Sequence, residues 1–583
     1  MKTKSIWLMM SCLAVVAMLM ASCAPAQEGV WGPEPPKGPP QYGGTYTLLT
    51  SYYTLDHLSF DHADMQWMHN YTAGPYQEGL VMGDLEKYGP TGTNEFSFDT
   101  QAYIPDEYLT GALAESWELE TDPMRMVFHI RPGVMWQGKP GVMEARELTA
   151  EDVKFSWERT VSSPRAIPHY YDWIDSFEAP DKYTLVVNMN AYNANWGYLI
   201  GWGYYTLISP PELAEEDEDG KAKVKNWKNA CGTGPFMLTD YVKGSYTIYE
   251  RNPNYWGTTT IDGKEYQLPF VDKMVWPIIA DEPTALAAVR SGQADVVWAV
   301  AWKDTASLDE TCPDLRKWQI HGRGLKTCVA MNVNNPPLDD VKVRQALSMA
   351  VDRQAMLDRL NGGMGVLFNF PFSADWELYT PLEELPESAR EVIEYNPEKA
   401  KQLLAEAGYP DGFECELVFF SATQIARDQA DMLQDNLADI GVDLKLNAMG
   451  DYGAYIGIMF SRRYDYMYMV GHGEGNPFSV LRKSLLPKQT WNVPDWIDYE
   501  YEEKVLTARA EIDEAKRNAA LKELNIYPVE QCPYIILPTG DFYRYAWPWV
   551  GNFYGQGIIG AVNGSGGQAR VWIDQEKKKA MGY

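Results

Sequence analysis

Apolar residues recur at helical spacing in several stretches of the chain, and some of these stretches carry their own start and stop signals. Thr149 and Asp152 have the spacing of a capping box, and Asn396 stands directly before a proline, as helix-capping residues do. Gly408 ends the run that Asn396 begins. The pattern predicts helices over residues 149–157, 343–351, 396–408 and 426–440.

The last of these runs is followed at once by a strand pattern. Gly441 stops the helix, and Val442, Leu444 and Leu446 then alternate with polar residues, which is typical of a strand with one buried face. A helix, a tight turn and a strand in this order form a connection found in α/β proteins. No repeat of 20–50 residues is present, which argues against solenoids and propellers. The pattern therefore predicts an α/β body.

Residues 1–22 have the pattern of an export signal. Lys2 and Lys4 precede a mostly apolar stretch that runs to Met20, and two small residues then precede Cys23. This ending resembles a bacterial lipobox, in which cleavage precedes the cysteine and its sulfur carries diacylglycerol. We expect lipidation at Cys23; a plain secretory signal and an uncleaved anchor helix are the alternatives.

A tether follows the signal. Residues 24–44 contain six prolines and five glycines, a composition that does not nucleate a helix and behaves as a semi-stiff spacer. No later segment has 18 uninterrupted apolar residues. We therefore expect residues 23–44 to be a lipidated tether that holds a folded body at the membrane through its N-terminus alone.

Length, charge and cysteines narrow the class of protein further. The chain has 583 residues, whereas single cores stop growing at about 250–300 residues, so at least two lobes are expected. The formal net charge of −30 repels phosphate backbones, which makes nucleic acid an unsuitable partner. None of the seven cysteines forms a CxxC pair. Cys12 lies in the signal and Cys23 is the expected lipidation site; of the other five, Cys312 and Cys328 are closest in sequence and are the first candidate for a disulfide.

Short motifs occur in a fixed order along nearly the whole mature chain. They are residues 113–118 (LAESWE), 128–134 (FHIRPGV), 148–153 (LTAEDV), 155–157 (FSW), 232–236 (GTGPF), 251–256 (RNPNYW), 331–334 (MNVN), 343–347 (VRQAL) and 395–400 (YNPEKA). Together they resemble family 5 of the bacterial extracellular solute-binding proteins. Members of this family are the dipeptide-, oligopeptide-, nickel- and oligosaccharide-binding partners of ABC importers. In the motif at 232–236, the glycines let the backbone pass where side chains would clash.

The resemblance implies an architecture and a role. The fold would be the two-lobed periplasmic-binding-protein fold (type II, large family-5 variant) with a hinge of two crossing strands. Residues 45–325 plus 541–583 would form one lobe and residues 326–540 the other. The protein would be a monomeric, extracytoplasmic lipoprotein without a cofactor. It would capture an oligopeptide-like solute by lobe closure and deliver it to the permease subunits of an ABC importer.

Catalysis and metal binding are the alternatives to this role. No GxSxG elbow, HExxH pair or P-loop is present, so the sequence does not favour an enzyme. His57, His62 and His69 lie near several aspartates, but spacings of five and seven do not place all three on one helical face. We expect neither an active site nor a metal site.

The identity of the solute stays open. Peptide binders of this family hold the ligand's amino terminus with an aspartate four residues before the proline of a loop, and the resemblance places that loop at 471–477. Gly473 occupies the position of the aspartate, and Glu474 lies one residue further on. A buried ammonium needs a paired anion, so this difference weakens the case for a peptide.

Aromatic residues favour an oligosaccharide instead. Flat aromatic faces suit the apolar face of a sugar ring, and amides suit its hydroxyls, although core packing is the default role of each aromatic residue. By resemblance, the cleft would contain Tyr53, Trp298, Trp302, Phe370, Glu474, Asn476, Trp491 and Asn492. Peptide and oligosaccharide therefore remain as near-equal alternatives.

Overall fold

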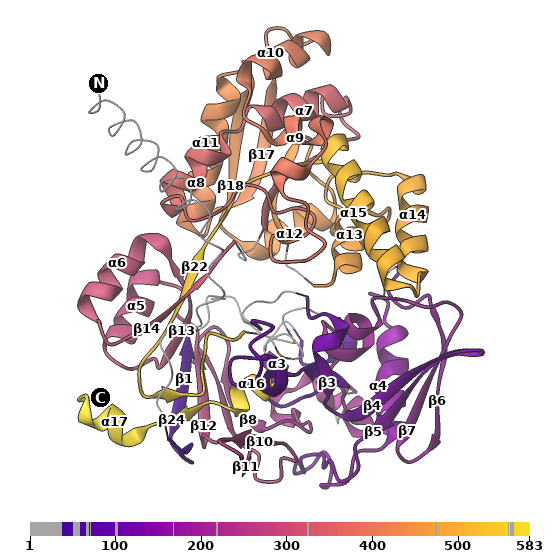
Figure 1. Ribbon diagram of the computed structural model, residues 1–583, viewed down its shortest axis with the longest axis vertical. Coiled ribbons are helices and arrows are strands. Elements are labelled where there is room, and N and C mark those ends of the chain that lie inside the picture. Colours follow the sequence, from indigo (N-terminus) through magenta and orange to yellow (C-terminus); the bar gives the residue numbers. More distant parts are fainter. Residues whose placement is uncertain are drawn as a thin grey trace, which may run out of the picture.

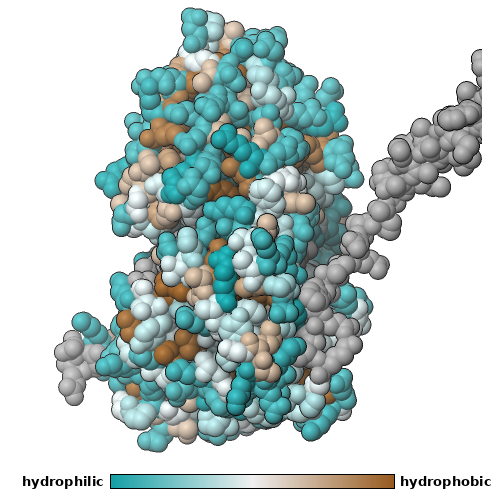
Figure 2. Space-filling model, turned by 90° about the vertical axis from the view of Figure 1, so that its left-hand side faces the viewer, coloured by the Kyte–Doolittle hydropathy of each residue, from teal (hydrophilic) through white to brown (hydrophobic). Residues whose placement is uncertain are grey.

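The computed structural model describes residues 38–49, 59–65, 69, 72–98, 103–166, 168–216, 220–322, 326–472, 475–557, 559 and 565–583. These residues form two lobes stacked along the long axis of the molecule (Figure 1). Lobe I contains the described residues from 38 to 322 and from 541 to 583, and lobe II contains those from 326 to 540. Seen from the side, a waist separates the lobes, and apolar residues lie in small scattered patches on this face (Figure 2).

Lobe I is built on two sheets. The larger sheet has the order β14 (Arg316–Ile320), β22 (Phe542–Ala546), β13 (Val296–Ala301), β1 (Thr45–Leu49), β12 (Lys273–Pro277), β9 (Tyr246–Arg251) and β8 (Phe236–Val242). The smaller, antiparallel sheet has the order β4 (Ala114–Thr121), β5 (Met124–Ile130), β7 (Thr184–Met189) and β6 (Ile174–Asp181). The main helices of lobe I are α4 (Ala150–Val161), α5 (Glu282–Arg290) and α6 (Trp302–Thr311).

Lobe II is a mixed five-stranded sheet covered by helices. The strand order is β18 (Asp443–Met449), β17 (Glu414–Phe420), β19 (Met467–His472), β15 (Lys326–Met331) and β20 (Tyr534–Ile536). The helices are α7 (Val341–Met349), α8 (Arg353–Asn361), α9 (Glu387–Ile393), α10 (Pro397–Glu406), α11 (Gln424–Ala438), α12 (Tyr452–Phe460), α13 (Pro477–Leu485), α14 (Tyr499–Ala510) and α15 (Glu514–Gln531). Helices and mixed sheets in two lobes confirm the expected fold class.

The predicted helices are present, with small shifts at their ends. Both hydrogen bonds of the capping box at the start of α4 are formed, and the Asn396 side chain accepts the Lys399 amide at the start of α10. Helix α7 ends at Met349, two residues earlier than predicted, because Asp352 caps the next helix, α8. Local capping chemistry therefore set these boundaries.

The chain crosses between the lobes twice, from β14 to β15 and from β20 to β22. Asp541 joins the two crossings. Its carboxylate accepts the Gly322 amide at 2.7 Å and the Gln319 side-chain amide at 2.5 Å, and it lies 3.1 Å from Nδ1 of His321. The side chain of Asp541 is fully buried. The hinge is thus held by one carboxylate rather than by apolar packing alone.

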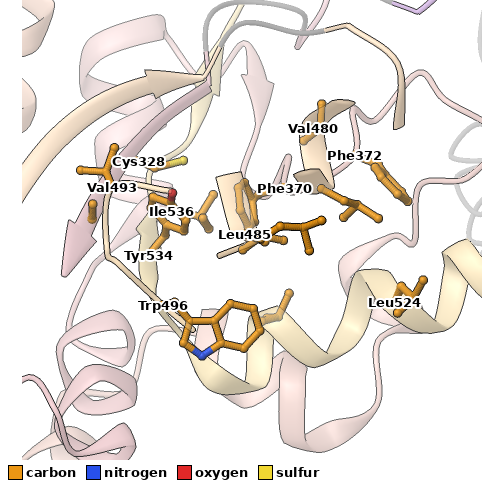
Figure 3. Packing of buried hydrophobic residues seen from close by; sticks show 14 of the residues in the cluster. Cys328, Phe370, Phe372, Val480, Leu485, Val493, Trp496, Leu524, Tyr534 and Ile536 are labelled. Atoms are coloured by element: carbon orange, nitrogen blue, oxygen red, sulfur yellow. The ribbon is translucent and has the colours of Figure 1, made fainter. Parts of the chain in front are cut away.

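Each lobe has its own apolar core. In lobe II, Figure 3 shows Phe370 and Leu485 among the buried side chains of one apolar cluster. Cys328 belongs to this core, whereas Cys312 belongs to the core of lobe I. The five described cysteines are free thiols, so Cys312 and Cys328, the first candidate pair, do not form a disulfide. None of the helices in the described ranges combines the length and apolar character needed to cross a bilayer.

Candidate functional site

The two lobes touch along a boundary on one side of the hinge. The Asn195 side-chain amide donates to Oγ of Ser479 at 2.8 Å, and this bond joins the lobes in a buried place. Gly475 of lobe II lies against the Tyr198 ring, so closely that a Cβ there would be 2.9 Å from the ring. Because ligand sites occur preferentially where domains meet, this boundary is the candidate site.

Tyrosines form the lobe I side of the boundary. Tyr198 lies on a π-helical turn, Gly197–Trp202, a rare geometry that is frequent at functional sites. Its ring centroid is 6.1 Å from that of Tyr204, and Tyr205 is 6.2 Å from Tyr170. Burial raises the pKa of Tyr205 well above its usual value, so its hydroxyl stays protonated. These rings offer flat apolar faces with hydroxyl groups at their edges.

Cations lie on the lobe II side. Nζ of Lys326 donates to the Pro371 carbonyl at 2.8 Å and lies 5.4 Å from the centroid of the Trp376 ring. His472 is buried next to it. Burial, together with the charges of Lys483 and Lys326, lowers the pKa of His472 far below its usual value, so its imidazole is neutral at pH 7. This side of the boundary therefore combines positive charge with a neutral imidazole.

Several buried polar atoms near the boundary have no hydrogen-bond partner within the described part of the protein. They are Nε1 of Trp376, Nδ2 of Asn193, Nε of Arg482, Nε2 of His472 and Oδ1 of Asn195. Leaving such an atom unpaired costs about 1–3 kcal/mol. The first three are obligate donors, so a molecule bound here would satisfy them best with carbonyl, carboxylate or hydroxyl oxygens.

Three of the predicted site residues lie inside the lobes. Trp298 is 5% exposed in the core of lobe I. Phe370 is 2% exposed, and its ring lies 5.3 Å from that of Tyr534 (Figure 3). The Asn492 side chain is bonded three times within its own loop, to the Leu486 carbonyl and to both backbone groups of Trp496. The structure gives these side chains roles in packing.

The remaining predicted residues are a buried helix cap, two partly exposed tryptophans and three residues outside the described ranges. Asn476 caps α13 by accepting the Phe478 amide at 2.9 Å. Trp302 begins α6 and packs on Gly362 at the end of α8, so it bridges the lobes beside the hinge. Trp491 is partly buried and meets the Phe460 ring edge-on at 6.0 Å. Tyr53, Glu474 and Cys23 lie outside the described residues.

The sequence analysis did not single out Tyr170, Tyr198, Tyr205, Lys326 or Arg482. Two tyrosine doublets, at 170–171 and 204–205, were the available signal. A doublet does not reveal which ring faces a partner lobe, because that depends on contacts with residues far away in the chain.

The histidines considered as metal ligands have other partners. Nε2 of His62 lies 3.1 Å from the Ser156 hydroxyl, and burial lowers the pKa of His62 to about 4. The ring of His69 contacts the Ser59 carbonyl at 3.1 Å and Oε1 of Gln77 at 3.2 Å. Across the described ranges, no group of three potential ligands could hold a metal ion. His57 lies outside those ranges.

Lobe I also contains a cavity of about 170 Å³. Its lining includes Thr110, Trp256 and an ion pair in which Arg570 lies 2.7 Å from Glu86. All of its lining residues come from lobe I. The cavity is therefore separate from the boundary between the lobes.

Comparison with known proteins decides the family. Residues 109–492 match the bacterial extracellular solute-binding proteins, family 5. The chain belongs to this family. Family 5 proteins bind solutes outside the cytoplasm and are not enzymes, so this chain is an extracytoplasmic binding protein.

Similar proteins agree with this assignment. The dipeptide-binding protein of Escherichia coli is 27% identical over 76% of this chain and 82% of its own length. Heme-binding protein A of Haemophilus influenzae is 29% identical over 57% of this chain and 60% of its own length. A structure of the ABC transporter-associated periplasmic binding protein DppA from Helicobacter pylori, in complex with the peptide STSA, has the same fold. It superposes with a TM-score of 0.74 at 23% identity, covering 92% of this chain and 99% of that one.

Proposed function

We propose that this protein captures a peptide-like solute by closing its two lobes and delivers it to the permease subunits of an ABC importer. The observation that carries the proposal is the set of buried donors at the boundary, on Trp376, Asn193 and Arg482. Peptides supply carbonyl and carboxylate acceptors at regular intervals. Closure removes water from such a site, which strengthens every polar contact inside it.

The peptide assignment draws further support from relatives. The Escherichia coli relative is named for dipeptides, and the Helicobacter pylori structure holds a tetrapeptide. For the ammonium group of a peptide, Glu474 is the acid nearest to the position where family 5 peptide binders carry an aspartate. We propose Glu474 as that partner.

An oligosaccharide is the second candidate, and the tyrosines at the boundary favour it. The rings of Tyr170, Tyr198 and Tyr205 are suited to stacking on sugars, and Oδ1 of Asn195 is free to accept a hydroxyl hydrogen. Trp302 and Trp491 would serve as additional stacking platforms in this case.

A thermal-shift screen separates the two candidates. The mature protein is heated with di- to pentapeptides, with cello-, xylo- and manno-oligosaccharides and with nickel. A ligand at a hundredfold excess over its Kd adds about 2.7 kcal/mol of stability, so binders raise the melting temperature. Peptides alone should shift it. A shift with sugars alone would remove the peptide proposal, and turnover of any compound would contradict a binding role.

Single substitutions test which side chains hold the solute. For a peptide, Glu474→Gln should weaken binding by several kcal/mol, roughly the cost of leaving a buried ammonium without its anion. For a sugar, Glu474→Gln should matter little, whereas Trp302→Ala or Trp491→Ala should each cost about 1–3 kcal/mol of binding energy. Calorimetric titration of the three variants distinguishes these patterns.

We further propose that the protein works as a monomer held to the membrane by diacylglycerol on Cys23. The small residues before Cys23 and the proline- and glycine-rich segment after it support this attachment. A two-chain lipid gives stable anchoring, whereas a single acyl chain gives only marginal binding.

A further inference from the structure

A short segment of lobe I, residues 168–172, is held by lobe II through its backbone. The Gln489 side-chain amide donates to the Pro168 carbonyl at 3.0 Å. Nη1 of Arg509, on α14, donates to the His169 carbonyl at 3.2 Å. Both donors come from the opposite lobe, so these bonds exist only while the lobes are closed. We call residues 168–172 the clasp segment.

The side chain of His169 lies between two carboxylates. Its Nδ1 is 3.2 Å from Oδ2 of Asp172, and its Nε2 is 2.7 Å from Oε1 of Glu502 on α14. A neutral imidazole carries one N–H and can donate to only one of them, whereas an imidazolium donates to both. His169 and Glu502 have side chains that are only 16% and 18% exposed, so the contact is largely shielded from water. The geometry is that of a protonated histidine.

The two carboxylates differ in which lobe carries them. Asp172 belongs to the clasp segment and stays beside His169 when the lobes separate, whereas Glu502 moves away. The hydrogen bond with Asp172 raises the pKa of His169, burial opposes this, and the hydrogen bond with Glu502 raises it further. The contribution from Glu502 is present only in the closed state. Because both ring nitrogens face a carboxylate only when the lobes are closed, we infer that closing favours protonation of His169 and that protonation favours closing.

The arginines around His169 do not cancel the effect of the two carboxylates on its protonation. Nη1 of Arg509 lies 3.7 Å from Oδ1 of Asp172, and it reaches His169 only at its backbone carbonyl. Arg482 on α13 stacks its guanidinium 3.7 Å from the centroid of the Tyr170 ring. Both arginines come from lobe II and bind the clasp segment themselves, so they also stabilise the contact between the lobes.

We propose that the clasp segment holds the lobes closed around the solute and that protonation of His169 tightens it. His169 and Glu502 act as positioning residues, because they fix the lobes without touching the solute. The proposal rests on lobe closure as the mechanism of the proposed function. The additional stabilisation of the closed state should be complete below the pKa that His169 has in the open state, and it should be lost as the pH rises through the higher pKa of the closed state.

The amide of Ala194 provides a reporter of closure that needs no ligand. It donates across the boundary to the Arg509 carbonyl at 2.9 Å, so it is protected from hydrogen exchange when the lobes are closed. The test compares Glu502→Gln with Glu500→Gln in the solute-free protein. Glu500 lies on the same helix but pairs with Lys504 in solvent, with its side chain 79% exposed. The two variants make the same change of charge two residues apart.

Glu502→Gln should exchange Ala194 about fivefold faster than the wild type at pH 6 and equally fast at pH 8.5, while Glu500→Gln should match the wild type at both. His169→Gln removes the other partner of the ion pair and should reproduce the result of Glu502→Gln. Agreement between the two variants would show that the result does not come from a folding defect in one of them. Equal exchange in Glu502→Gln and Glu500→Gln at pH 6 would overturn the clasp. Failure of the proposed function is a separate result, since it would appear as the absence of any thermal shift with peptides.

Discussion

Asp541 shows what one buried carboxylate does at the point where the chain returns to lobe I. Burial by itself would raise the pKa of this group, but hydrogen bonds from His321, Gln319 and the Gly322 amide outweigh burial and lower it. Asp541→Asn should therefore lower the free energy of unfolding by about 1–3 kcal/mol at pH 7, as measured by urea denaturation. Gly322 is 219 residues away in the chain, so the sequence could not reveal this pairing.

The Asp541 carboxylate also makes the free energy of unfolding depend on pH. Because its pKa is lower in the folded state, its contribution is complete above the unfolded pKa of about 3.9 and is lost as the pH falls through the folded value. The difference between Asp541→Asn and the wild type should therefore shrink below pH 4. Asp314→Asn, at an exposed position in the same lobe, is the control and should have no effect at either pH. An equal loss in both variants would contradict the role of the hinge carboxylate.

At the scale of elements, α13 (Pro477–Leu485) tests whether Asn476 is a cap or a ligand. Its side chain accepts the Phe478 amide, so Asn476→Ala should cost about 1 kcal/mol of stability, whereas Asn476→Asp should cost almost nothing, because aspartate caps equally well. Thermal denaturation measures both. If Asn476→Asp were as unstable as Asn476→Ala, the cap would not be the reason for the asparagine.

Local signals of this kind explain which elements could be predicted. The caps at Thr149 and Asn396 lie within a few residues of the amides they bind, so the sequence reveals the helices that they begin. The glycines of the 232–236 motif were also predictable: a Cβ at Gly232 would lie 1.9 Å from the Tyr76 carbonyl oxygen. The residues of the candidate site were harder to predict from the sequence. Trp298 and Tyr198 are both buried aromatic residues, and only the tertiary structure brings one of them to the boundary.

At the scale of the whole molecule, membrane attachment should depend on one sulfur atom. Cys23→Ser should move the protein from the detergent phase to the aqueous phase, or leave an uncleaved precursor, because the diacylglycerol would have no attachment point. Cys12→Ser makes the same substitution within the leader and should leave partitioning unchanged. Identical partitioning of Cys23→Ser and the wild type would show that the protein is not a lipoprotein.

The two-lobed organisation itself followed from the length of the chain and from its ordered motifs, whereas the contacts between the lobes did not. Asn195 and Ser479 are 284 residues apart, and nothing near either residue indicates the other. Such contacts depend on how two independently folded lobes approach each other. In a protein that works by closing its lobes, these contacts determine the function, so the sequence alone does not reveal them.

Small-angle X-ray scattering of the mature protein tests lobe closure most directly. The measurement compares the radius of gyration without solute and with a saturating concentration of the peptide that gives the largest thermal shift. Contacts such as the hydrogen bond between Asn195 and Ser479 join the lobes only when these lie close together, so closing around a solute should make the molecule more compact. A radius that stays unchanged when the peptide is shown by calorimetry to be fully bound would contradict capture by closure.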